Sequence, residues 1–259
     1  MSNVLTFHSS LLIGDLIYAL PGIRQVCRTY NRKAIIYLGL NLAWPMPKEI
    51  SRNGGITMTD QDFKMIKPLL MSQWYIEDVR PHNGEKVAVN FDDIFTYKIN
   101  VPYGYLPRWY FYIWPDMACD LSVPWITDIY NGDGDTIILN RSARYHNPSI
   151  SYKFLEQYKS KILFIGHDDE WKSFCKTQFE VRHYKVKDFL DLAILINSCR
   201  FFIGNQSFCF SLAEGLKKPR ILELFEQLPN VIPHGEYAYD YYSQGAFEGY
   251  VDKLVKMTE

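Results

Sequence analysis

The carboxylate of Asp15 is the first side chain in this sequence that could carry out chemistry. Asp15 follows Gly14 at the start of a stretch with helical apolar spacing, and the polar residues His8, Ser9 and Ser10 lie shortly before it. A carboxylate at the N-terminal edge of a helix can be a plain cap worth about 1 kcal/mol. It can also accept a proton from an attacking hydroxyl, and the helix N-terminus favours its ionised form by roughly 0.3 to 1 kcal/mol. Asp15 is therefore a candidate general base.

A second polar cluster, Gly204 to Phe208, follows an apolar run and precedes another helical pattern. Its Gly-Asn pair can turn the chain, and Asn205, Gln206 and Ser207 can cap the helix. In an open parallel sheet, ligands bind beyond the carboxyl ends of the strands, where a helix N-terminus offers N–H groups to phosphate or sugar oxygens. An ordinary strand–turn–helix would show the same pattern, so this alternative stays open.

A third cluster follows the predicted strand at 136–139. It consists of Asn140, Arg141, Ser142 and Arg144. Arginine can grip phosphate oxygens bidentately, and we expect these side chains at the carboxyl end of the strand, facing a cleft between domains. Arg144 is the better candidate of the two arginines, and the alternative is a solvated basic loop.

Alternation of apolar strands and helical patterns indicates an α/β chain with a parallel sheet. A turn-rich polar stretch at 128–135 separates two halves, which we place at residues 1–130 and 131–259. Each half is long enough to bury about two-thirds of its surface. Strands are predicted at 4–7, 34–38, 86–91, 136–139, 161–165, 181–184, 201–203 and 220–225, and helices at 16–28, 59–72, 151–158, 168–178, 187–198 and 208–216.

The aromatic run Tyr103 to Trp114 interrupts this pattern, and the first half is expected to be irregular there. Core packing is the common use of such residues. A stacking wall for a sugar or base and an interfacial membrane patch are the alternatives. Arg108 alone gives little cationic support to the membrane interpretation.

Composition excludes several classes of protein. An apolar content of 47% excludes a disordered chain, and a formal net charge of −1 argues against a polyanion-binding surface. We expect neither a signal peptide nor a membrane span. The five cysteines are scattered without metal-ligand spacing, which favours reduced thiols in the cytoplasm and no metal site. His146, His167, His183 and His234 likewise show no metal-ligand spacing.

Together, the first two clusters resemble glycosyltransferase family 9, the lipopolysaccharide heptosyltransferases. The segment HSSLLIGDLIYALPGIRQV looks like that family's amino-terminal signature, in which a Ser-rich loop precedes Gly-Asp and a helix with Leu-Pro. The segment FIGNQSFCFSLAEGLKKP is similar to its carboxy-terminal signature, Gly-Asn-Asp-Ser-Gly followed by a helix with Leu-Ala-Ala and by Gly-Lys-Pro. The two segments cover about a seventh of the chain and occur in the family's order.

The resemblance implies the GT-B architecture, in which two Rossmann-like domains with mostly parallel sheets face a cleft. It also implies an inverting, metal-independent transfer of a sugar from a nucleotide-sugar donor to an acceptor hydroxyl, with Asp15 as general base. The first half would bind the acceptor through His8, Ser9, Ser10 and Gly14. The second half would bind the donor through Asn140, Arg141, Ser142, Arg144, Gly204, Asn205, Gln206, Ser207, Phe208 and Glu214, since GT-B enzymes use a glutamate on this helix for the donor ribose. Glu223 and Glu226 are comparable candidates for that role.

Three positions depart from the family pattern. Gln206 replaces its Asp, Phe208 its Gly and Ser211 its His, and the loop before Gly14 is longer. The family's Asp meets the hydroxyls of the donor sugar, and an amide can donate hydrogen bonds whereas an ionised carboxylate only accepts them. We therefore expect a donor other than ADP-heptose.

Two classes of function follow from these residues. The first is an inverting glycosyltransferase, and the second is a catalytically inactive sugar-nucleotide or glycan-binding protein of the same fold. A sugar-nucleotide epimerase or hydrolase is a weaker third hypothesis. The acceptor stays open among a lipid-linked glycan, a protein, a small metabolite and a modified nucleic-acid base.

Overall fold

The chain folds into two α/β units. The computed structural model describes residues 3–44, 54–97, 99–101 and 103–257. Contacts group residues 1–120, 125–129 and 188–190 into unit 1, and residues 121–124, 130–187 and 191–259 into unit 2. Each unit has one sheet, and every strand pair in both sheets is parallel.

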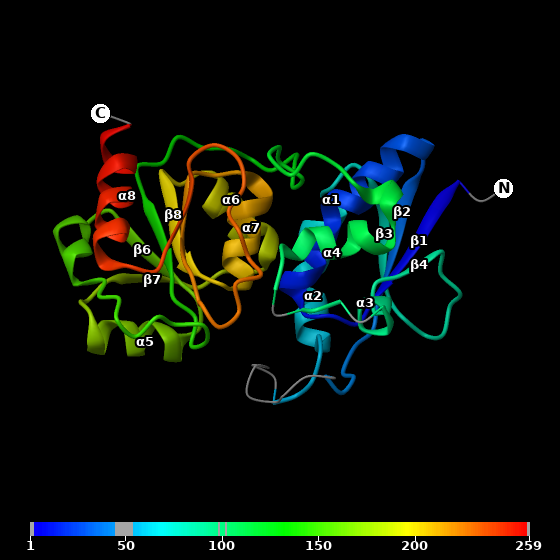
Figure 1. Ribbon diagram of the computed structural model, residues 1–259, viewed down its shortest axis with the longest axis horizontal. Coiled ribbons are helices and arrows are strands. Elements are labelled where there is room, and N and C mark those ends of the chain that lie inside the picture. Colours follow the sequence, from blue (N-terminus) through cyan, green and yellow to red (C-terminus); the bar gives the residue numbers. More distant parts are fainter. Residues whose placement is uncertain (1–2, 45–53, 98, 102, 258–259) are drawn as a thin grey trace. The chain divides into compact units, whose positions relative to one another are not determined.

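Unit 1 has a four-stranded sheet in the order β3-β2-β1-β4. Helices α1, α2 and α4 gather on one face of this sheet (Figure 1). Helix α2 begins with a capping box, in which Thr59 and Asp62 bond each other's main-chain N–H groups. The elements are β1 (Val4–Ser9), α1 (Ile13–Tyr30), β2 (Lys33–Leu38), α2 (Asp60–Met71), β3 (Ile76–Pro81), β4 (Val89–Asn90), α3 (Asp93–Thr96), α4 (Leu106–Ile113) and the 3-10 helix η2 (Pro115–Met117).

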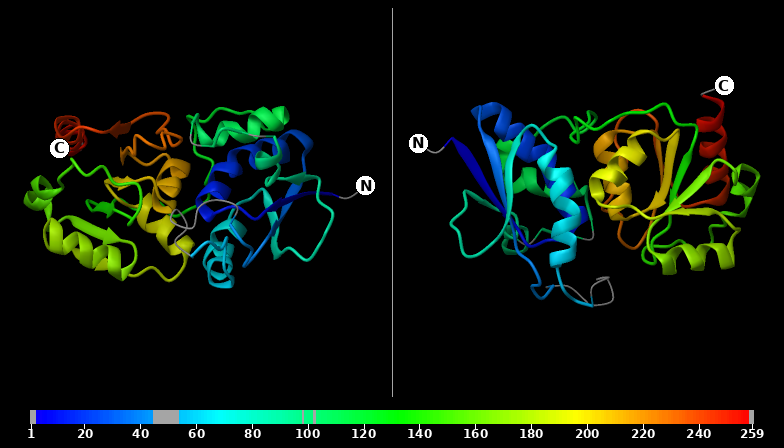
Figure 2. Two further views of the ribbon diagram at one scale, coloured as in Figure 1. Left: turned by 60° about the horizontal axis from the view of Figure 1, so that its bottom comes forward. Right: turned by 180° about the vertical axis from the view of Figure 1, so that it is seen from behind.

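Unit 2 has a six-stranded sheet in the order β10-β9-β8-β5-β6-β7. Helices α5 and α8 cover one face, and α6 and α7 cover the other (Figures 1 and 2). The elements are β5 (Ile137–Asn140), the 3-10 helix η3 (Lys153–Tyr158), β6 (Ile162–Ile165), α5 (Asp168–Thr177), β7 (Arg182–Tyr184), α6 (Phe189–Asn197), β8 (Phe201–Asn205), α7 (Phe208–Leu216), β9 (Arg220–Glu223), β10 (Ala238–Tyr241) and α8 (Gln244–Lys256).

The core of unit 2 follows from the alternation of side chains along its strands. Ile137 and Leu139 on β5 pack in one cluster with Phe174 of α5 and Phe247 of α8. Phe202 on β8 points to the opposite face, where its ring meets that of Phe210 on α7 at 6.1 Å between centroids. Both faces are apolar, which explains the continuous apolar strands of the second half.

Several predicted elements differ from the structure. The strand predicted at 86–91 shrinks to β4, which pairs with β1 only through Phe7–Val89 and His8–Asn90. The helix predicted at 151–158 is the 3-10 helix η3. Strands β3 and β10 and helix α8 were not predicted. Both strands lie at sheet edges and carry charged or polar side chains, which breaks the apolar pattern.

The aromatic run at 103–114 is not irregular, because it contains α4. Pro107 lies in the first turn of this helix, where a missing N–H costs nothing. Trp109 and Tyr110 are buried, whereas Tyr112 is exposed. The core-packing interpretation is therefore confirmed for the inner side of α4.

Two further expectations concern the membrane and the cysteines. Over the described ranges, no helix combines the length and apolarity that crossing a bilayer requires. All five cysteines are free thiols. Burial raises the pKa of Cys27, Cys199 and Cys209 to about 12.

Candidate functional site

The topology of each sheet marks one position where a ligand would bind. In unit 2 the chain runs from β5 through β6 to β7 on one side, and then from β8 through β9 to β10 on the other. The topological switch point therefore lies between β5 and β8, and ligands of open α/β sheets bind at the carboxyl ends of such strands. In unit 1 the corresponding switch point lies between β1 and β4.

Asn205, at the carboxyl end of β8, holds the loop that follows β5. The Asn205 side chain is fully buried. Its Oδ1 accepts hydrogen bonds from the main-chain N–H of Ser142 at 2.9 Å and from the Ser142 hydroxyl at 3.2 Å. Its Nδ2 donates to the main-chain oxygens of Ser142, Arg144 and Tyr145. The structure thus brings the second and third clusters of the sequence together.

Ser207 and Asn140 extend this contact across the switch point. Ser207 is the N-cap of α7, where its hydroxyl oxygen accepts from the N–H of Phe210. The same hydroxyl donates to Oδ1 of Asn140 at 2.8 Å, and Nδ2 of Asn140 donates to the main-chain oxygen of Ile165 at 2.8 Å. Phe208 is the first residue of α7 and is half-buried. The N-terminus of α7 therefore lies at the switch point, where its dipole favours an anion.

Gly204 allows the close approach of β8 and β5. A Cβ at this position would lie 2.8 Å from the main-chain oxygen of Asn140 and 2.7 Å from the Phe202 ring. Both distances are shorter than real Cβ contacts, so a larger residue would push the two strands apart. The glycine is thus needed for packing, whatever ligand binds nearby.

The side-chain amide of Gln206 makes its hydrogen bonds within unit 2. Its Oε1 accepts from the main-chain N–H of Phe225 at 2.9 Å. Its Nε2 donates to the main-chain oxygen of Leu228 at 2.7 Å and to Oδ1 of Asn230 at 3.3 Å. The glutamine thus holds the loop after β9, and contact of this amide with the donor sugar stays a prediction.

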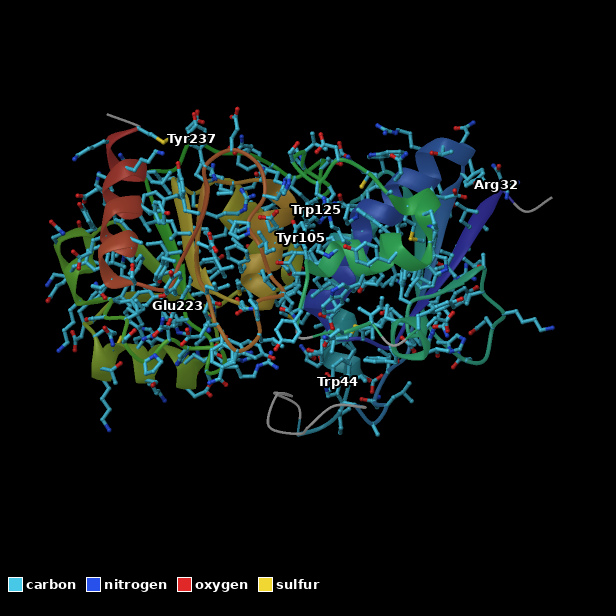
Figure 3. The ribbon with its side chains drawn as sticks, viewed as in Figure 1. Arg32, Trp44, Tyr105, Trp125, Glu223 and Tyr237 are labelled. Atoms are coloured by element: carbon cyan, nitrogen blue, oxygen red, sulfur yellow. The ribbon has the colours of Figure 1, made fainter. Side chains whose placement is uncertain are left out.

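Arg141 is engaged in a buried ion pair. Its Nε and Nη2 donate to the two carboxylate oxygens of Glu223 at 2.9 and 2.8 Å, and its guanidinium lies over the ring of Tyr152. Glu223, labelled in Figure 3, is fully buried and also accepts from the Tyr152 hydroxyl and the Asn147 N–H. Burial acts to lower the pKa of Arg141, but the hydrogen bonds to Glu223, together with the electrostatic effects of Tyr152, Glu223 and Tyr241, raise it overall. Arg141 and Glu223 are thus engaged with each other, and a role of either in donor binding stays a prediction.

Arg144 lies in the same loop, with its guanidinium over the ring of Tyr145 at 5.1 Å from the centroid. It is half-buried. Tyr145 in turn meets the ring of Phe225 at 5.5 Å between centroids. Of the two arginines in this loop, Arg144 is therefore the one near the switch point that Glu223 does not engage.

Glu214 lies away from the loops at the switch point. It is fully buried and forms ion pairs with Lys217 and Arg220. Its carboxylate also accepts from the main-chain N–H of His234. These contacts fix the segment after β9, so the expectation of a ribose contact is not supported by its surroundings. Glu226 is exposed in that segment.

Two functional candidates in unit 2 were not predicted. Glu170 is buried and accepts from the N–H groups of Ala143 and His167 at 3.1 and 3.0 Å, so it also holds the loop after β5. His146 bonds the main-chain oxygen of Ser142 through Nε2. Burial, followed by the charge of Arg141, lowers the pKa of His146. Two positions in the sequence could have indicated them. His146 lies in the loop after the strand predicted at 136–139, and Glu170 lies in the first turn of the helix predicted at 168–178.

In unit 1, Asp92 holds the loop that follows β1. Its carboxylate accepts from the main-chain N–H of Ser10 at 2.8 Å and from the Ser10 hydroxyl at 2.6 Å. His8 is buried, and its Nδ1 lies 2.8 Å from Oδ1 of Asn90 and 3.6 Å from Asp92. The Ser9 hydroxyl oxygen accepts from the N–H of Leu11. Asp92 was not predicted, although it directly follows a predicted strand.

Asp15 is the third residue of α1, and Gly14 is the second. The N-cap residue is Leu12, which makes no side-chain cap, so Asp15 is not a plain N-cap. The Tyr110 hydroxyl donates to the main-chain oxygen of Asp15 at 3.0 Å. Burial, followed by the charges of Asp15 and Asp92, raises the pKa of Tyr110 well above its usual value. The charges of both carboxylates therefore raise the pKa of the same hydroxyl.

Surface hollows and metal clusters do not single out another site. Hollows of about 830 and 320 Å³ lie around Trp171 in unit 2 and Trp114 in unit 1, and no predicted site residue lines either. In the part of the chain that the structure describes, no group of three or more His, Cys, Asp or Glu side chains could hold a metal ion. The expectation of a metal-independent reaction stays a prediction.

Comparison with known proteins identifies the fold. No family model and no curated protein matches the sequence. The structure is similar to E. coli heptosyltransferase WaaC with ADP (TM-score 0.66, 9% identity, 97% of this chain and 99% of that chain). It is also similar to the glycosyl transferase family 9 protein from Veillonella parvula DSM 2008 (0.59, 11%, 98% and 91%). A third neighbour is the iron-containing dodecameric glycosyltransferase TibC from enterotoxigenic E. coli H10407 (0.62, 13%, 99% and 77%). At these identities the likeness concerns the fold alone, and the chain has the GT-B-like fold of the family 9 heptosyltransferases that its two signatures resemble.

Proposed function

We propose that this protein is a glycosyltransferase that uses a nucleotide-sugar donor, and that unit 2 binds the donor at the β5/β8 switch point. The observation that carries the proposal is the contact of Asn205 with Ser142, which places the loop after β5 beside the N-terminus of α7. Several main-chain N–H groups and one arginine then converge where the fold binds ligands. A solved neighbour with this fold is described with ADP.

The diphosphate of the donor is assigned to Arg144 and the N-terminus of α7. Arg144 is preferred to Arg141 for this role because Arg141 forms an ion pair with buried Glu223. The guanidinium of Arg144 can make charge-assisted bonds to phosphate oxygens, and the helix dipole adds to the attraction. Both interactions strengthen as negative charge develops on the leaving diphosphate, which is how such a site would lower the barrier.

The acceptor is assigned to unit 1 and the proton transfer to Asp15. The acceptor hydroxyl gives its proton to the carboxylate of Asp15 while its oxygen bonds to the anomeric carbon of the donor sugar. The bond between that carbon and the diphosphate breaks, and the nucleoside diphosphate leaves. Attack opposite the leaving group inverts the anomeric configuration. Asp15, in the first turn of α1, and Asp92, beside Ser10, place two carboxylates near the end of β1, and like charges repel a diphosphate. This supports the division of roles.

A sugar-nucleotide-binding protein without transferase activity is the second candidate. The observation that favours it is Gln206, whose amide is used to hold the loop after β9 and therefore does not take over the role of the family's Asp. Such a protein would bind the same donor at the same loops. Release of nucleoside diphosphate in the presence of acceptor distinguishes the two candidates.

Screening by thermal shift, followed by a release assay, tests the proposal. We expect a nucleoside diphosphate or nucleotide sugar to raise the melting temperature, since a ligand at 100 times its Kd adds about 2.7 kcal/mol to native-state stability. Positive ligands are then incubated with candidate acceptors, with and without a chelator. Failure of every nucleotide to stabilise the protein would contradict the proposal. Loss of activity with the chelator would contradict metal-independence.

A further inference from the structure

Consecutive residues at the end of β8 hold two different loops. Asn205 bonds the loop after β5, through Ser142, Arg144 and Tyr145. Gln206 bonds the loop after β9, through Phe225 and Leu228. Strands β5 and β9 flank β8 in the sheet, so the loops that follow them lie on either side of the end of β8. Both side chains are buried, and both ends of each amide are used.

The loop held by Asn205 contains a strained residue. Tyr145 has a φ of 57°, in the left-handed region that a non-glycine residue rarely adopts. Such a conformation persists only where its surroundings fix it. Here Nδ2 of Asn205 donates to the carbonyls of Arg144 and Tyr145, which flank the Tyr145 Cα, and to that of Ser142. Three carbonyls of the strained turn therefore share one amide donor.

The two loops meet through their aromatic side chains. The ring of Tyr145 lies 5.5 Å from that of Phe225 between centroids, and the guanidinium of Arg144 lies over the Tyr145 ring. The Tyr145 ring thus contacts both Arg144 and Phe225, so the conformation of Tyr145 influences the positions of both side chains. Asn205 and Gln206 fix both ends of this chain of contacts.

We propose that Asn205 and Gln206 are positioning residues that brace the two loops of the donor site in the ligand-free protein, and that Asn205 acts through the left-handed turn at Tyr145. The assignment of these loops to the donor rests on the proposed function, whereas the bracing does not. In this account neither amide contacts the donor. Their removal weakens nucleotide binding because Arg144 is no longer held in place.

Hydrogen exchange of the ligand-free protein tests the brace without any nucleotide. Asn205→Asp keeps the acceptor for Ser142 and loses the donor to the three carbonyls. We expect exchange over residues 141–147 to speed up by about tenfold or more, the equivalent of roughly one lost hydrogen bond. Gln206→Glu keeps the acceptor for Phe225 and loses the donor to Leu228, so the change should centre on residues 225–230. Asn197→Asp, which removes the bond from Asn197 to the Tyr130 carbonyl, is the control for a new carboxylate elsewhere in unit 2.

A second substitution separates positioning from added charge. Asparagine tolerates the left-handed region better than tyrosine does. In the Asn205→Asp background, Tyr145→Asn should therefore restore slow exchange over residues 141–147. The carboxylate introduced by Asn205→Asp is still present in this double variant, so added charge alone would not explain the recovery. Binding of ADP and UDP, measured by calorimetry, should fall about tenfold in Asn205→Asp. It should stay weak in the double variant, because that variant lacks the Tyr145 ring over which the Arg144 guanidinium lies.

Three results would overturn the proposal. The first is unchanged exchange over 141–147 in Asn205→Asp, and the second is a double variant that exchanges as fast as the single one. The third is equal loosening of every peptide of unit 2, which would indicate a general loss of stability. If the exchange pattern is as expected but neither ADP nor UDP binds the wild type, the brace stands and the assignment of its loops to these nucleotides fails.

Discussion

Ser10 donates both its main-chain N–H and its hydroxyl to the carboxylate of Asp92, and this pair links β1 to β4 across the switch point of unit 1. Unit 2 repeats the arrangement, since Ser142 donates the same two groups to the amide oxygen of Asn205 across β5 and β8. The partner is a charged carboxylate in unit 1 and a neutral amide in unit 2. This difference is consistent with an uncharged acceptor hydroxyl at the first edge and a diphosphate at the second.

Asp15→Asn should lower turnover by roughly 100-fold or more while leaving donor binding and folding nearly intact. Folding should be unaffected because Tyr110 bonds the main-chain oxygen of Asp15, which the substitution preserves. The measurement is nucleoside diphosphate release at saturating donor and acceptor. Asp116→Asn, at an exposed carboxylate of unit 1, is the control. Equal turnover of Asp15→Asn and wild type would remove Asp15 from the mechanism.

Arg144→Ala should weaken nucleoside diphosphate binding by about 1.5 to 3 kcal/mol, because a charge-assisted contact is lost. Its effect on stability should be small. Titration calorimetry measures the affinity. Equal affinities of the variant and the wild type would support the alternative that this segment is a solvated basic loop with no role in binding.

Arg141→Ala should instead destabilise the fold. The substitution leaves Glu223 buried without its cation, and breaking a buried pair in this way costs about 3 to 5 kcal/mol. Urea unfolding measures the loss. An unfolding free energy within roughly 1 kcal/mol of that of the wild type would contradict the structural role given to this pair.

The folded protein should become less stable as pH falls below about 6.5, and His146 should contribute to this loss. Its pKa is lowered in the folded protein, so the unfolded chain binds more protons below its usual pKa of about 6.5. The folded state is then relatively less stable as pH falls from about 6.5 through the lowered pKa. His146→Gln should reduce the difference in unfolding free energy between pH 7.5 and 5.5. An unchanged difference would show that His146 does not contribute.

Asp92→Ala should destabilise unit 1 by about 1 to 3 kcal/mol, because the partly buried N–H and hydroxyl of Ser10 lose their acceptor. Asp92→Asn should cost less, since an amide oxygen serves Ser142 in the same way in unit 2. Comparison of the two variants by denaturant unfolding checks this. If both variants were as stable as wild type, the contact would have no role in the fold.

The sequence predicted the central strands and the helices that follow the two signatures, because their apolar patterns are continuous. It did not predict β3, whose Glu77, Asp78 and Arg80 suit an edge strand and break the pattern. The two predicted polar clusters, Asn140 to Arg144 and Gly204 to Phe208, do meet at one switch point, and their role as a ligand site stays a prediction.

The roles of individual side chains could not be predicted in the same way. Arg141 and Glu223 are 82 residues apart in the sequence, and only the pairing of β5, β8 and β9 brings them together. The hydrogen bonds of Gln206 could not be predicted either, because its partners belong to a loop whose sequence has no recognisable pattern. Local spacing indicates which residues reach the edge of a sheet, but tertiary contacts decide which of them remain for a ligand.

The most direct test of this account is hydrogen exchange of the wild-type protein with ADP, UDP, GDP and CDP in turn. We predict that at least one of them slows exchange at residues 141–147 and at the start of α7, with no comparable protection around Trp171 and Arg182. Protection by none of the four, or protection only in that second region, would contradict the assignment of the donor site to the β5/β8 switch point.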